Sequence, residues 1–229
     1  MNPLEIREAQ IFKILEKIKE EKFVLIGGYA VNSYTLPRFS VDCDIVVKKS
    51  NSLENIKTKL VSAGYKKKEE GKSKTAYYGE FLRYEKTGES MFKVSMDILI
   101  DAVTDRSSSA VFSADWTFEH SDFRVLRGKT IVEKVSLRIV NPDALIAMKT
   151  VACRSTDIRD IFMLIVHVNN FNWIQQEVQE RTNFKKQAKI IREKVSSIAF
   201  KNNLQGVYGF IDEKLFEKHT KLVLSFCES

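Results

Sequence analysis

Residues 23–47, FVLIGGYAVNSYTLPRFSVDCDIVV, carry the most informative pattern in this chain of 229 residues. Residues 23–26 are a short continuous apolar run, which is typical of a buried strand, and Gly27 and Gly28 end it in a tight turn. A short helix is predicted over residues 29–36. Because glycine has no Cβ, backbone N–H groups in such a turn can approach a ligand closely, and a helix N-terminus favours an anion. The arrangement suits a triphosphate.

Two carboxylates follow the glycine pair, the first of them fourteen residues after Gly28. Residues 41–47 alternate as a strand does, which places Asp42 and Asp44 on the same face, about 6.6 Å apart along the backbone. Converging carboxylates at this spacing can share two divalent cations, which lie roughly 3.5–4 Å apart in two-metal sites. Oxygen ligands favour Mg²⁺ or Mn²⁺ over zinc. The alternative is that both are surface acids at the end of a strand.

A third acid follows the same logic on a later strand. Asp97 lies within the predicted strand 92–101, where Met96 and Ile98 flank it and face the core. A carboxylate in such a place needs a partner or a cation, because burying an unpaired charge is costly. Asp97 is therefore a candidate third metal ligand, and a surface strand acid is the alternative.

The rest of the chain predicts two parts of different character. The first carries a helix to about Lys19, capped by Asn2, and it alternates helices with strands. After Asn141 and Pro142, helical patterns dominate to the last residues. We therefore expect an α+β fold, with a mixed-sheet domain over residues 1–140 and a helical domain over residues 141–229. The further predicted elements are helix 53–63, strands 75–84, 123–126 and 137–140, and helices 143–152, 156–168, 173–180, 183–201 and 212–226.

Composition excludes several classes of protein. The chain is 44% hydrophobic and 29% charged, which is ordinary globular usage and excludes a disordered chain. No apolar run approaches the roughly 20 residues that a membrane span needs, so no membrane contact is expected, and the N-terminus lacks a signal-peptide layout. The three cysteines are too far apart for a disulfide framework or a thiolate metal site. A cytoplasmic protein is expected.

The net charge is +7, from 37 Lys and Arg against 30 Asp and Glu. Between residues 57 and 74, seven lysines face only Glu69 and Glu70, a local charge of +5. This basic stretch is either the solvated edge of a helix and a strand or a contact with a phosphate backbone.

The glycine pair and the acids together resemble a known family. The spacing Gly-Gly-x13-Asp-x-Asp, with Asp97 on a later strand, resembles the nucleotidyltransferase superfold shared with DNA polymerase β. Residues 38–44, RFSVDCD, match the R-x-[TS]-x-D-h-D form of the AbiEii/MenT-like toxin nucleotidyltransferases. These families also carry a helical segment with a lysine, an arginine and a D-x-x-D run, and matching positions here are Lys149, Arg154, Asp157 and Asp160. The resemblance covers about residues 20–47 and 92–165.

The resemblance implies transfer of a nucleoside monophosphate from an NTP to an acceptor hydroxyl, with pyrophosphate leaving. Asp42 and Asp44 would hold the Mg²⁺ or Mn²⁺ ions, and Asp97 would bind the second metal and orient or deprotonate the acceptor hydroxyl. The residues expected to contact the nucleotide are Gly27, Gly28, Arg38, Ser40 and Lys149.

Four of the side chains that carry the resemblance also have simpler interpretations. Arg38 could pair with Asp42 instead of phosphate, and Lys149 could be a solvent-facing helical lysine. Arg154 and Asp157, three residues apart, could form a helix ion pair.

The acceptor is expected to be an RNA 3′ end, tRNA for preference, or a protein side chain, and an antitoxin protein is an expected partner if the toxin resemblance holds. Two alternatives remain at this point. One is a non-catalytic nucleotide- or nucleic-acid-binding module on the same scaffold. The other is an enzyme that modifies a small hydroxylated molecule such as an aminoglycoside, which the positive charge does not favour.

Overall fold

A computed structural model describes residues 2–72, 80–88, 92–105 and 108–228. The chain divides into two compact units. The first comprises residues 1–33, 37–104 and 111–140, and the second comprises residues 34–36, 105–110 and 141–229.

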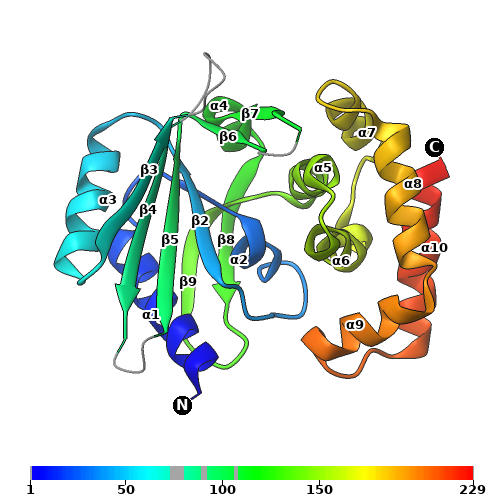
Figure 1. Cartoon of the computed structure of the whole chain (residues 1–229), viewed down its shortest axis with the longest axis horizontal. Helices are drawn as coiled ribbons and strands as arrows, with labels where there is room; N and C mark the ends of the chain where they lie inside the picture. Colours follow the sequence, from blue (N-terminus) through cyan, green and yellow to red (C-terminus); the bar gives the residue numbers. More distant parts are fainter. Residues whose placement is uncertain (1, 73–79, 89–91, 106–107, 229) are drawn as a thin grey trace. The chain divides into compact units, whose positions relative to one another are not determined.

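A seven-stranded mixed sheet forms the centre of the first unit (Figure 1). Its strands in spatial order are β3 (Lys66–Lys72), β4 (Glu80–Thr87), β5 (Lys93–Ile100), β2 (Asp42–Val47), β1 (Val24–Ile26), β9 (Lys134–Val140) and β8 (Ser121–Arg127). The pairs β2–β5 and β1–β9 are parallel, and the other neighbours are antiparallel. The short central strand β1 is fully buried, as its continuous apolar run predicts.

Helix α1 (Pro3–Ile18) packs on β5 and β9, and α3 (Asn51–Ser62) packs beside α1. The predicted cap is confirmed, because the Asn2 side chain accepts from the backbone of Glu5 and the Glu5 side chain accepts from Asn2. The remaining elements of the first unit are α2 (Gly27–Val31), the two-stranded ribbon of β6 (Ala102–Thr104) and β7 (Val111–Ser113), and α4 (Ala114–Glu119).

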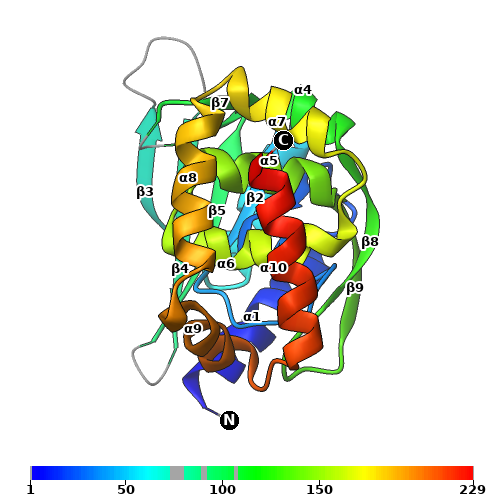
Figure 2. The same ribbon diagram turned by 90° about the vertical axis from the view of Figure 1, so that its right-hand side faces the viewer.

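The second unit is helical. Its helices are α5 (Pro142–Ala152), α6 (Ser155–Leu164), the 3₁₀ turn η1 (Ile165–His167), α7 (Phe171–Gln179), α8 (Phe184–Val195), α9 (Ile198–Tyr208) and α10 (Glu213–Glu228). Figure 2 shows α8 and α10 side by side. Phe162 of α6 packs against the aromatic rings of Phe200, Phe216 and His219, which ties α6 to α9 and α10.

Several predicted elements differ from the structure. Helix 29–36 is wrong in its bounds, because α2 spans only Gly27–Val31 and residues 32–36 form turns and bends. The Asn32 side chain closes this segment by binding both backbone groups of Arg38. The single helix 183–201 is wrong, because α8 ends at Val195 and α9 begins at Ile198 after two serines that favour caps over helix interiors. The sequence patterns do not predict the ribbon β6–β7 or helix α4. Residues 75–79 of the predicted strand 75–84 lie outside the described residues.

The basic stretch 57–74 lies on α3 and on the edge strand β3, apart from Ser73 and Lys74, which lie outside the described residues. Lys66, Lys67 and Lys68 are exposed, which both interpretations of this stretch require. Cys43, Cys153 and Cys227 are free thiols. Within the described ranges, no helix has the length and apolar character needed to cross a bilayer.

Candidate active site

The three predicted metal-binding acids lie on two neighbouring strands in the middle of the sheet. In the parallel pair β2–β5, Asp44 lies opposite Asp97, and Asp42 lies opposite Ser95. The Ser95 hydroxyl donates to Asp42, which orients that carboxylate. Strand register therefore brings together carboxylates that are more than fifty residues apart in the sequence.

The glycine turn lies directly against Asp44. Gly27 has a φ of +67°, and a Cβ added there would lie 2.1 Å from Oδ2 of Asp44. Both observations require glycine at this position, because a side chain would be strained by the backbone and would collide with the carboxylate. The turn and the acid therefore form one compact structure.

The second glycine faces the other predicted nucleotide contacts. A Cβ on Gly28 would lie 2.4 Å from the Ser40 hydroxyl and 3.0 Å from Nη2 of Arg38. The buried side chain of Asn32 accepts from the Arg38 backbone N–H at 3.1 Å and donates to the Arg38 carbonyl at 2.8 Å. Asn32 thus holds the segment that carries Arg38. The sequence does not distinguish Asn32 as a site residue, because an asparagine beside a turn has many ordinary roles.

A further residue that the sequence did not indicate is Arg83 on β4. It lies opposite Asp97 in the β4–β5 pair, where its Nε and Nη2 donate to the two carboxylate oxygens at 2.8 and 2.6 Å. Nη2 also lies 3.9 Å from Oδ2 of Asp42. The alternation of strand 80–87 places Arg83 on its polar face, but only the pairing of β4 with β5 brings it to Asp97.

The electrostatic field of the acids reaches the thiol of Cys43, which lies between Asp42 and Asp44 in the sequence. Burial raises the pKa of Cys43 well above its usual range, and the charges of Asp44, Asp97 and Asp42 raise it further. Cys43 therefore remains a neutral core thiol and is not a nucleophile.

The donor chemistry of this cluster fits a divalent cation. Three carboxylates supply hard oxygen ligands, and the missing Cβ of Gly27 lets Oδ2 of Asp44 lie directly against the turn. As the side chains stand, however, the described part of the chain contains no group of three His, Cys, Asp or Glu residues arranged to hold a metal ion. Both oxygens of Asp97 accept hydrogen bonds from Arg83.

The second unit holds the remaining predicted residues. Lys149 is buried, so the solvent-facing interpretation is wrong; its Nζ lies 2.7 Å from Asp160 and 3.2 Å from Asp157. Arg154 pairs with Asp157 at 3.7 Å, which confirms the predicted helix ion pair, and with Asp105 at 3.1 Å. Lys149 is thus a cation that two carboxylates hold in a fixed place.

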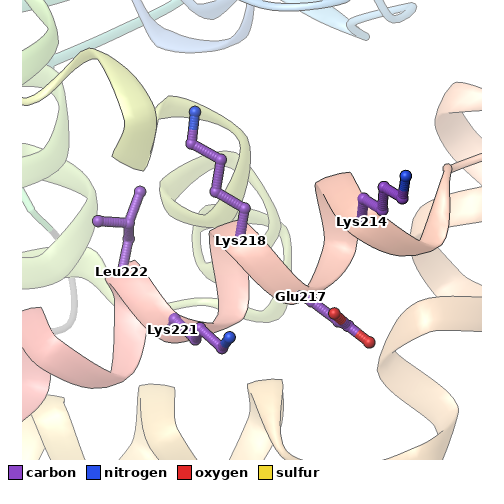
Figure 3. A pocket seen from close by; sticks show the side chains of 5 residues that line it. All are labelled: Lys214, Glu217, Lys218, Lys221 and Leu222. Atoms are coloured by element: carbon purple, nitrogen blue, oxygen red, sulfur yellow. The ribbon is translucent and has the colours of Figure 1, made fainter.

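A shallow hollow lies along α10, lined by Lys214, Glu217, Lys218, Lys221 and Leu222 (Figure 3). Every lining residue comes from one helix face, at the spacing of successive turns. The hollow contains none of the predicted catalytic residues, and its three lysines make that face basic.

Solved structures with a similar fold match nearly the whole chain. A Helicobacter pylori protein described as a nucleotidyltransferase is 16% identical with a TM-score of 0.52, and the match covers 100% of this chain and 94% of that one. JHP933 from Helicobacter pylori is 17% identical with a TM-score of 0.50, and the match covers 100% and 91%. MenT4, a nucleotidyltransferase toxin from Mycobacterium tuberculosis, is 11% identical with a TM-score of 0.53, and the match covers 98% and 83%. None of the curated proteins compared with this chain matches it.

The predicted α+β fold is confirmed, and it is that of a nucleotidyltransferase. Residues 12–221 match the family described as the nucleotidyl transferase AbiEii toxin of type IV toxin–antitoxin systems, and the chain belongs to that family. The resemblance drawn from residues 23–47 is therefore confirmed, and so is the expectation of an enzyme that transfers a nucleotidyl group.

Proposed function

We propose that this nucleotidyltransferase moves a nucleoside monophosphate from an NTP to the 3′ hydroxyl of an RNA, tRNA being favoured, in a reaction that depends on Mg²⁺ or Mn²⁺. We propose further that it acts in the cytoplasm and that an antitoxin protein restrains it. The observation that carries the proposal is the placement of Asp42, Asp44 and Asp97 on adjoining strands beside the Gly27 turn.

The three carboxylates and Ser95 each have a role in this proposal. Asp42 and Asp44 hold the cations with Asp97, and Asp97 also orients the acceptor hydroxyl. Bound divalent cations would offset the charge of the triphosphate and lower the pKa of the hydroxyl, so that no strong separate base is needed. The Ser95 hydroxyl donates a hydrogen bond to Oδ1 of Asp42 and so fixes the orientation of that carboxylate.

The remaining residues serve the triphosphate. Gly27 and Gly28 bring backbone N–H groups close to the phosphates, since neither carries a Cβ. Arg38 and Ser40, which lie against Gly28, add a guanidinium and a hydroxyl. Lys149 is proposed as a further triphosphate ligand, already desolvated and held by Asp157 and Asp160.

The charge of the chain supports a polyanionic acceptor. The net charge is +7, and exposed lysines gather on β3 and on the α10 face of Lys214, Lys218 and Lys221. Lysines neutralise backbone phosphates and so contribute to RNA affinity. A cationic aminoglycoside would require an acidic acceptor site instead, which this charge does not favour.

The central test is Asp44→Ala. The protein is incubated with each α-³²P-labelled NTP, Mg²⁺ and either total tRNA or a whole-cell protein extract, and the two pools are separated on gels. Label is expected in the tRNA pool with the wild type and is expected to be lost by a factor of at least about 100 with Asp44→Ala, since metal binding supplies several kcal/mol of transition-state stabilisation. Asp122→Ala, an exposed aspartate on β8, is the matched control and should label normally.

Circular dichroism of Asp44→Ala is the check that this variant is folded. Transfer retained in the folded variant would contradict the assignment of Asp44, and label in the protein pool alone would replace RNA by a protein acceptor. Absence of transfer together with absence of metal-dependent NTP binding in calorimetry would contradict the proposed reaction.

The acceptor has its own test on α10. Replacing Lys214, Lys218 and Lys221 together by Glu reverses the charge of that face without touching the acids of the sheet. We expect tRNA binding, measured by filter binding at 100 mM salt, to weaken at least about tenfold, because each lost phosphate contact reduces affinity and its salt dependence. Unchanged affinity would show that this face does not contact the RNA.

A further inference from the structure

Arg83 lies among the carboxylates that the proposed function assigns to metal binding. Its guanidinium forms a two-pronged ion pair with Asp97, and one of the same nitrogens lies 3.9 Å from Asp42. The Asp97 side chain is 8% exposed, and the Arg83 side chain is 29% exposed. The pair is therefore largely removed from water and held by good geometry.

Such a pair has a clear physical basis. The carboxylates of Asp42, Asp44 and Asp97 repel one another, and a nearly buried carboxylate needs a positive partner. Arginine stays charged at any pH relevant to proteins, and its planar fork matches the two oxygens of a carboxylate. Arg83 therefore supplies a permanent cation to Asp97 from the neighbouring strand.

The same contact restricts what Asp97 can do as a metal ligand. Both of its oxygens accept hydrogen bonds from Arg83, and these oxygens are the ones that a divalent cation requires. The arrangement agrees with the finding that the described residues contain no group of three acids or other ligands ready to hold a metal. Each oxygen keeps a second lone pair, but a cation that binds on the side where Arg83 donates must displace one of its two donors. A cation that binds Asp97 elsewhere is repelled by the nearby guanidinium.

We propose that Arg83 is a positioning residue that holds Asp97 until a divalent cation displaces it, and that it thereby weakens the binding of that cation. The inference rests on the proposed function, because it takes Asp97 as a metal ligand. Only molecules in which Arg83 has released Asp97 can use that carboxylate as a ligand. The apparent metal affinity is therefore the intrinsic affinity multiplied by the fraction of molecules in which Asp97 is released.

The test measures Mn²⁺ binding by isothermal titration calorimetry, without nucleotide, on protein stripped of metal with EDTA. Arg83→Gln removes the competing cation, and its dissociation constant for Mn²⁺ is expected to fall about tenfold relative to the wild type. Arg83→Lys keeps the charge but cannot engage both oxygens, so it should also bind Mn²⁺ more tightly than the wild type, though less than Arg83→Gln. Arg127→Gln on the edge strand β8 is the control and should match the wild type.

A second readout is the unfolding temperature. Stripped Arg83→Gln protein should unfold at a lower temperature than stripped wild type, since Asp97 loses its partner, and saturating Mn²⁺ should raise its unfolding temperature by more than it raises that of the wild type. A merely structural role for Arg83 would lower stability without improving metal affinity.

Each outcome decides the inference. Equal or weaker Mn²⁺ binding by folded Arg83→Gln overturns it, and so does an affinity of Arg83→Lys equal to that of the wild type, which would show an effect of charge alone. If Arg83→Gln does not fold, Arg83→Lys gives the decision. Failure of the proposed function looks different, because Mn²⁺ would then fail to bind the wild type or would bind Asp44→Ala equally well.

Discussion

The role of an individual side chain in the first unit depends on the residue that faces it across the sheet. Asp97 lies opposite Asp44 on the neighbouring strand β2 and opposite Arg83 on the other neighbouring strand, β4. Its carboxylate is therefore flanked by the Asp44 carboxylate on one side and by the Arg83 guanidinium on the other. A shift of either strand by one residue would turn the whole set to the other face. The chemistry of the site therefore depends on register as much as on residue type.

Gly27 is the residue whose backbone most directly limits substitution. Gly27→Ala is expected to lower the free energy of unfolding by about 2 kcal/mol or more, because a left-handed φ costs an L-residue about 1–2 kcal/mol and the new methyl group would collide with Asp44. The measurement is urea denaturation followed by circular dichroism. Gly206→Ala, in α9 with nothing within 4 Å of the added methyl group, is the control and should be neutral or slightly stabilising. Equal effects of the two substitutions would contradict this account of Gly27.

At the scale of elements, polar contacts connect segments that lie far apart in the sequence. Glu8 is a buried acid on α1, where the other buried residues are apolar. Its carboxylate accepts from the backbone N–H groups of Lys129 and Thr130 at 2.7 and 2.8 Å and from the Thr130 hydroxyl at 2.8 Å. The helix thereby holds the loop between β8 and β9.

Glu8→Ala is expected to destabilise the protein by about 2–3 kcal/mol, since hydrogen bonds to a charged acceptor contribute about 1.5–3 kcal/mol and their backbone donors would lose their partner. Thermal and urea unfolding measure this loss. Glu16→Ala on the same helix, where the Glu16 side chain is about half exposed and pairs with Lys19, should change stability by less than about 0.5 kcal/mol. A loss of similar size in both variants would show that helix propensity, and not the loop contact, is responsible.

At the scale of the whole molecule, each unit has its own core and its own charged groups. In the second unit, buried His219 lies in the aromatic cluster of Phe162, with its Nδ1 2.7 Å from the Phe162 carbonyl oxygen. Burial lowers the pKa of His219 below its usual value, and Lys218 and His167 lower it further, while the contact with the Phe162 carbonyl acts in the opposite direction. The folded state therefore favours the neutral imidazole.

This shift predicts the direction of a pH effect. The contribution of His219 to stability is fully present above the unfolded pKa of about 6.5 and is lost as the pH falls through the lower folded pKa. The free energy of unfolding should therefore fall between pH 7.5 and pH 5.5, by at most about 1.4 kcal/mol per pH unit from this group. His219→Asn should remove that part of the dependence, and exposed His167→Asn should retain most of it, because burial is the largest cause of the shift. Parallel pH profiles for the wild type and His219→Asn would contradict the prediction.

Local patterns in the sequence predicted much of this protein because their physical causes are local. The capped first helix, the buried strand before Gly27, the alternating strand of Asp42 and Asp44 and most of the second unit's helices follow from caps, periodicity and glycine. The same residues indicated the family and the acids proposed as its catalytic centre.

Contacts between distant residues required the folded chain. No periodic pattern predicts the ion pair of Arg83 with Asp97, the contact of Glu8 with its loop or the burial of Lys149, because each depends on strand pairing or on the packing of separate elements. The contact of Asn32 with Arg38 spans only six residues, but it depends on the path of the turn between them, which no periodic pattern describes. Sequence spacing describes neighbours along the chain, whereas electrostatic partners are chosen by distance in space. The acids could therefore be recognised from their order, but the cation that accompanies them could be recognised only after β4 was paired with β5.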